Sequence, residues 1–91
     1  MLNFAAMTAI RDARKARARV QNLLRDRGFT QRDVLKLAEK YVGEEITEQL
    51  IGQVYAGRKG KKGGPKVDAI MRATCELVGV KRSVLFPADE E

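Results

Sequence analysis

The chain has 91 residues, of which 44% are hydrophobic, and it carries a formal net charge of +6. This length leaves room for one small core, and this apolar fraction is typical of a globular domain rather than a disordered chain. With no histidine and a lone cysteine, Cys75, an intrachain disulfide is impossible and a zinc site is effectively excluded. We therefore expect no metal and no cofactor.

The basic balance favours a polyanionic partner, although charge alone does not separate DNA from RNA or acidic lipid, and a solvated basic surface without a partner is the alternative. The first ten residues, "MLNFAAMTAI", have their cations after the apolar stretch rather than before it. That order argues against a signal peptide, and no apolar run approaches membrane-spanning length. We expect a cytoplasmic protein with no membrane partner.

Residues 8–27 form the first periodic segment. Apolar side chains recur there at three- and four-residue spacing, which predicts a helix with basic residues on its other faces. Gly28 follows where a left-handed helix terminator is expected. The predicted apolar positions are Ile10, Ala13, Ala16, Val20, Leu23 and Leu24.

A second helix is predicted over residues 30–41. Thr30 stands at the cap position, and Asp33 occupies the capping-box position three residues on, while Phe29 and Val34 have hydrophobic-staple spacing. Gly43 is expected to end this helix. Its inward positions are Val34, Leu37, Ala38 and Tyr41.

The same pattern recurs in "ITEQLI" and predicts a third helix over residues 47–56. Thr47 is the cap, and Ile46 and Ile51 form the staple pair. Leu50, Ile51 and Val54 face inward, with Tyr55 as a further candidate. The expected outer face is short, polar and free of Lys and Arg, and consists of Glu48, Gln49, Gly52 and Gln53.

Gly57 opens a basic loop, after which Pro65 suits the first turn of a fourth helix. The apolar stripe of that helix includes Cys75, which we interpret as a small core residue rather than a reactive thiol. Its other members are Val67, Ile70, Met71, Thr74 and Val78, and Gly79 ends the helix. "VLFP" is expected to pack as a short helical turn before the acidic tail, residues 88–91. Nothing alternates like a strand, so we predict an all-α single domain of four to five helices, with a core over residues 8–87.

An enzyme is not expected. "GRKGKKGGPK" lacks the spacing and the hydroxyl residue of a Walker loop, and no strand precedes it. Without histidine the usual general base is missing, and no serine or cysteine has a nucleophile's partner. The acidic cluster of Glu44, Glu45 and Glu48 is better explained as solvated helix-end charge. No small-molecule ligand is evident.

The order of the second and third helices indicates a different function. Two helices joined by a Gly-containing turn, the second with small polar residues at its start, have the layout that enters a DNA major groove. Glutamine amides read adenine edges, and a glutamate accepts from the cytosine amine. A single outward Gln is more often solvated surface, but Gln49 and Gln53 together on this helix favour base contacts.

Three stretches carry a resemblance: "TQRDVLKLAEKYVG", "ITEQLIGQVYAGRK" and "GGPKVDAIMRATCELVGVKRSVLF". Together they resemble the helix-turn-helix domain of the phage lambda repressor/Cro (XRE-type) family, and the small size and "LFP" ending are similar to Ner-like phage regulators. The family opens its second helix with Thr-Gln, ends the recognition helix in Gly, and closes on a hydrophobic-Gly-hydrophobic signature. The resemblance covers residues 11–87.

The resemblance implies a DNA-binding transcriptional regulator, a phage-type repressor that acts as a homodimer on a two-half-site operator. It implies that Gln31 bonds a backbone phosphate, and that Glu48, Gln49 and Gln53 face base edges. By position, phosphate contacts are expected from Arg32 and from a flexible cationic loop, namely Arg58, Lys59, Lys61 and Lys62.

Two features depart from the family pattern. The segment between Gly43 and Thr47 is about two residues longer than the tight turn of such motifs. The acidic cluster of Glu44, Glu45 and Glu48 also adds negative charge near the predicted reading face. Both keep a rival open: a helical protein-interaction module, antitoxin-like or an anti-regulator, whose third-helix face binds another protein. RNA binding ranks third, because no aromatic platform or RNA-binding signature is present.

Overall fold

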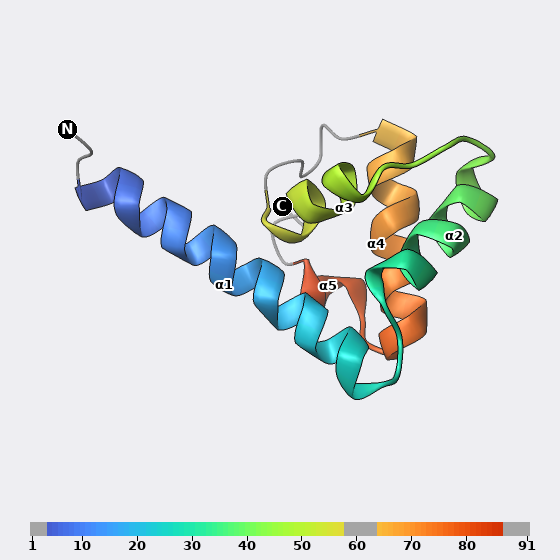
Figure 1. Cartoon of the computed structure of the whole chain (residues 1–91), viewed down its shortest axis with the longest axis horizontal. Helices are drawn as coiled ribbons and strands as arrows, with labels where there is room; N and C mark the ends of the chain where they lie inside the picture. The colour runs from blue at the N-terminus through green and yellow to red at the C-terminus, as the bar shows by residue number, and fades with distance from the viewer. Residues whose placement is uncertain (1–3, 58–63, 87–91) are drawn as a thin grey trace.

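The computed structural model describes residues 4–57 and 64–86, with side chains from Ala13 onward in the first helix. Helices are the only regular secondary structure among the described residues (Figure 1), which confirms the predicted all-α fold. The helices are α1 (Phe4–Asp26), α2 (Gln31–Val42), α3 (Glu48–Tyr55), α4 (Gly64–Val78) and α5 (Arg82–Leu85).

Helix α1 is the longest element, with 23 residues, and it begins earlier than the apolar periodicity predicted. The additional residues include two alanines and a methionine, which are strong helix formers and favour an extension of the helix toward the N-terminus. Its C-terminal half holds it to the domain, because Val20 and Leu24 are each 1% exposed. The N-terminal half extends away from the other helices (Figure 1). Ile10 lies outside the described side chains.

Helix α2 begins with the capping box that the sequence predicts. The Thr30 hydroxyl accepts from the Asp33 backbone N–H at 3.3 Å, and the Asp33 carboxylate accepts from the Thr30 N–H at 2.8 Å. Aspartate therefore performs the reciprocal role that glutamate or glutamine usually fills. Gly43 ends the helix in the left-handed conformation, with φ of 72°. Its N–H donates to the Glu39 carbonyl at 2.8 Å.

Helix α3 is short but well buried on one side. The Thr47 hydroxyl accepts from the Leu50 N–H at 3.2 Å, which confirms the predicted cap. Both members of the expected staple are buried, Ile46 at 3% and Ile51 at 0% exposed. Tyr55 is buried as well, and its hydroxyl lies 2.7 Å from that of Thr74 on α4. Helix α3 is thus fixed to α4 by apolar packing and by a buried polar contact.

The core lies between α2 and α4, with α1, α3 and α5 packed around them. Seven of the positions predicted for α2 and α4 are buried: Val34, Ala38, Val67, Ile70, Met71, Thr74 and Val78. Others are half-buried and pack at the edge of the core, namely Leu37, Tyr41 and Cys75. The fold therefore confirms Cys75 as part of the packing.

The short C-terminal helix begins at Arg82, two residues before the expected "VLFP" turn. Leu85 and Phe86 are buried, and the Phe86 ring stacks on Tyr55 with centroids 6.3 Å apart. Val84 is 60% exposed, so that part of the expected apolar knot faces outward. Pro87 lies outside the described residues.

Candidate functional site

The five-residue connection between α2 and α3 is held at both ends. The Glu39 carboxylate, from the last turns of α2, accepts from the Ile46 backbone N–H at 2.8 Å. Gly43 supplies the left-handed turn, and the buried Ile46 side chain anchors the segment to the core. The connection is longer than a tight turn, but a side-chain hydrogen bond compensates for its length and fixes where α3 begins.

A glutamine links the beginnings of α2 and α3. The Gln31 side-chain amide donates to the backbone carbonyl of Glu48 at 3.3 Å, and its oxygen accepts from the Gln21 amide of α1 at 3.3 Å. Two helix N-termini, each with unpaired N–H groups and partial positive charge, therefore lie together. Arg32 is exposed beside them. The resemblance implies that Gln31 contacts a backbone phosphate. In this structure the Gln31 side chain, on α2, is already hydrogen-bonded to α1 and to α3.

A groove of ≈ 410 Å³ runs between α1 and α3. One wall is the outward face of α3, and it includes all three residues predicted to contact bases. Glu48 and Gln49 are exposed, whereas Gln53 is half-buried. The complete lining is Ala13, Arg14, Arg17, Glu48, Gln49, Gly52, Gln53 and Ala56.

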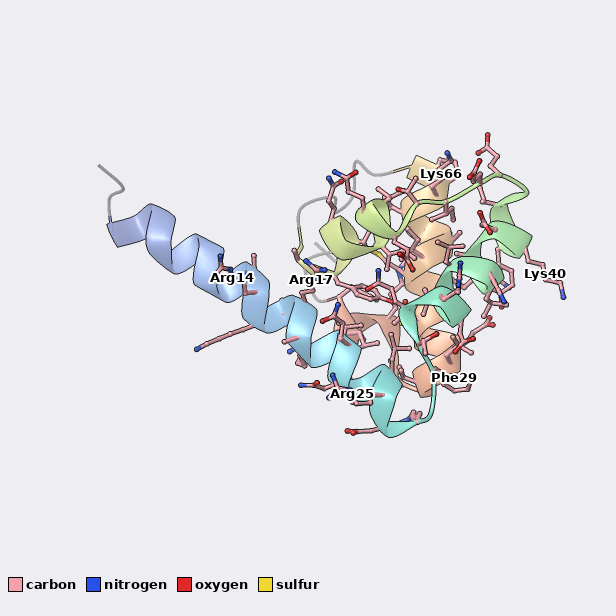
Figure 2. All side chains as sticks on the ribbon, viewed as in Figure 1. Arg14, Arg17, Arg25, Phe29, Lys40 and Lys66 are labelled. Atoms are coloured by element: carbon pink, nitrogen blue, oxygen red, sulfur yellow. The ribbon has the colours of Figure 1, made fainter. Side chains whose placement is uncertain are left out.

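Two arginines of α1 belong to this site, although the sequence pattern did not predict them. Arg14 and Arg17 are exposed and form the α1 wall of the groove (Figure 2). Their three-residue spacing places them on one side of the helix, which was the available signal. The sequence does not reveal that this side of α1, rather than another basic side, faces α3.

The prediction that Gly52 belongs to the outer surface of α3 was wrong. Gly52 is buried, because the Arg17 guanidinium lies over it. A Cβ at position 52 would lie 3.6 Å from Arg17 Cζ and 3.8 Å from its Nε and Nη2, which is ordinary van der Waals contact. An arginine from α1 therefore covers the middle of the predicted reading face.

Charge around the groove is mixed. Helix α3 itself contributes Glu48 and no cation, while Glu44 and Glu45 are exposed on the connection before it. The cations that line the groove come from α1, whereas Arg32 lies exposed in the first turn of α2. The four predicted loop contacts lie outside the described residues and stay predictions: Arg58, Lys59, Lys61 and Lys62.

A second polar cluster lies on α2 and α4. The Tyr41 hydroxyl donates to the Glu76 carboxylate, and the Arg72 guanidinium carbon stands 4.4 Å from the Tyr41 ring centroid. The hydrogen bond to Glu76 is the main reason that the pKa of Tyr41 is raised. These contacts stabilise the outside of the α2–α4 pair. Within the described residues, no group of His, Cys, Asp and Glu side chains is arranged to hold a metal ion, and no helix is long and apolar enough to cross a membrane.

In comparisons with known proteins, no family model, no curated protein and no solved structure matches the chain. The resemblance to the lambda repressor/Cro family accordingly rests on the sequence motifs and on the order in which they occur.

Proposed function

We propose that this chain is a sequence-specific DNA-binding regulator that inserts α3 into the major groove. The observation that carries the proposal is the hydrogen bond from the Gln31 amide to the Glu48 carbonyl, which brings the starts of α2 and α3 together. Gln49 and Gln53 stand on the side of α3 that lines the groove, outside the core. A helix presented in this way can offer amide groups to base edges while the neighbouring helix start meets the backbone.

Electrostatics support the same orientation. Arg14 flanks α3 from α1, and Arg32 lies exposed in the first turn of α2 beside the paired helix starts. Cations beside a reading helix, rather than on it, are suited to phosphates at the rims of a major groove. The net charge of +6 agrees with a polyanionic partner. Glu48 has a place in this scheme as an acceptor for a cytosine amine.

The direct test begins with selection of preferred sequences from a randomised duplex library by the wild-type chain. Gln49→Ala should then cost ~1–3 kcal/mol on the selected duplex, the value of one bidentate base contact. On random duplex it should cost almost nothing, because an uncharged amide holds no counterion-releasing phosphate contact. Asn22→Ala is the matched control: it removes an exposed amide from α1 that does not line the groove. Full discrimination by a folded Gln49→Ala protein would remove α3 from the reading role.

Dimeric binding is part of the proposal. A single domain of this size contacts only a few base pairs, and a symmetric dimer contacts twice as many. Half-site centres should lie about one helical turn, ~34 Å, apart or a multiple of it. Footprinting and a stoichiometric titration measure this directly. A footprint over one unrepeated half-site, with one chain bound, would contradict it.

The rival function is recognition of another protein by the α3 face. It is favoured by one observation: three exposed glutamates, Glu44, Glu45 and Glu48, lie at and before the start of α3. Carboxylates there repel phosphate but suit a basic protein surface. A chain that binds duplex DNA without any sequence preference would favour this rival.

A further inference from the structure

Helix α3 lacks the side chain that makes the commonest specific base contact. Arginine reads guanine by two parallel hydrogen bonds to its O6 and N7 atoms, and α3 (Glu48–Tyr55) contains no arginine or lysine. Its groove-lining residues supply amides, one carboxylate and, at Gly52, no side chain at all. As built by α3 alone, the reading face is suited to adenine and cytosine and has no guanine reader.

Arg17 of α1 occupies the place that is empty on α3. Its guanidinium lies over Gly52, within 3.6–3.8 Å of the position that a Cβ would take. Gly52 lies one helical turn after Gln49 and directly before Gln53, so the guanidinium stands on the face that carries both amides. Because Gly52 has no side chain, the guanidinium packs directly over the α3 backbone, and even a Cβ at this position would meet it only at ordinary van der Waals distance.

The Arg17 guanidinium is also available to a ligand. It belongs to an exposed residue, and no hydrogen bond or ion pair engages it among residues 13–57 and 64–86. Arg19, on the same helix, differs, since its guanidinium donates to the Leu85 carbonyl at 3.3 Å. Packing against Gly52 limits the conformations of Arg17 without consuming its donors. A planar guanidinium group held in this way loses little conformational entropy when it forms hydrogen bonds with a ligand.

We infer that Arg17 completes the reading face of α3 and contacts a guanine in the operator, between the bases that Gln49 and Gln53 contact. This inference rests on the proposed DNA-binding function and assigns a base contact to a helix other than the one in the groove. A phosphate contact is the competing role for the same side chain. The two roles differ in whether the loss of Arg17 changes the preferred sequence.

The test is to repeat the duplex selection with the wild-type chain, Arg17→Ala and Arg25→Ala. Arg25 is the matched control, an exposed arginine on the same helix that does not line the groove (Figure 2). Arg17→Ala should lose the guanine preference at one position of each half-site, with affinity for the wild-type duplex reduced about 5- to 150-fold. Arg25→Ala should keep the wild-type preference. Both variants should melt like the wild type, because each removes an exposed side chain and alanine is a good helix former.

Salt dependence gives the second readout. A phosphate contact contributes about 0.9 to the log–log salt slope, whereas a base contact releases no condensed counterion of its own. For Arg17→Ala we expect the slope to fall by less than half of that value. An unchanged preferred sequence, with equal loss on selected and random duplexes and a slope lower by ~0.9, would overturn the inference and leave the proposed function intact. A wild-type chain without any sequence preference would overturn both.

Discussion

The contact between Tyr55 and Thr74 allows a prediction whose asymmetry follows from counting hydrogens. The Thr74 hydroxyl donates to the Ile70 carbonyl at 2.8 Å, and a hydroxyl has one hydrogen, so Tyr55 must be the donor in the 2.7 Å contact between them. Both residues are buried, at 2% and 0% exposed. Thr74→Val leaves the tyrosine hydroxyl buried without its acceptor, whereas Tyr55→Phe leaves threonine with its own donor satisfied.

Thr74→Val should therefore lower the free energy of unfolding by about 1–3 kcal/mol, and Tyr55→Phe by about 0.5–1.5 kcal/mol. The double variant buries no unsatisfied group, so it should be more stable than Thr74→Val alone. Urea unfolding followed by circular dichroism measures the free energy of unfolding of all three variants. In thermal unfolding, a loss of 1 kcal/mol should lower Tm by about 4–8 °C. The reasoning would be refuted if Tyr55→Phe cost more than Thr74→Val, or if the double variant were the least stable of the three.

Two further predictions concern the same helix and the connection before it. Burial raises the pKa of Tyr55 above its ordinary value of 10.0, so in alkali the unfolded chain loses this proton before the folded chain does. Stability should then fall as the pH rises above 10, by up to ~1.4 kcal/mol per pH unit, and Tyr55→Phe should lose less over the same range in urea titrations. Parallel curves for the two proteins would contradict this. Glu39→Ala removes the acceptor of the Ile46 N–H, and it should cost ~1.5 kcal/mol and speed hydrogen exchange at that amide. An unchanged exchange rate would show that the carboxylate does not hold the connection.

The boundaries of α2 and α3 followed from the sequence because the signals that set them are local. Thr30 and Asp33 are three residues apart, and the hydrogen bonds of the capping box form within a single turn. At α3 the Thr47 hydroxyl likewise caps the Leu50 N–H three residues on, and Gly43 ends α2 by a backbone conformation that glycine adopts at little cost. Such contacts need no knowledge of the rest of the fold.

The α3 face was predicted only in part. Periodicity separated Ile51 and Val54 from Gln49, since each helical position faces the core or faces away from it. The same periodicity predicted that Gly52 is exposed to solvent, because nothing within α3 covers that position. The residue that covers it, Arg17, comes from another helix, and its approach depends on how α1 and α3 pack.

From sequence alone, the all-α fold, the two threonine caps and the polar character of the α3 face were determined, because each depends on contacts within a few residues. Tertiary structure alone decided which side of α1 meets α3, that Gln31 joins α1, α2 and α3, and that the Glu39 carboxylate holds the Ile46 amide. The periodicity of α1 leaves several basic sides equivalent along an isolated helix. Burial of Val20 and Leu24 against the core sets the rotation of α1, and that rotation places Arg17 over Gly52.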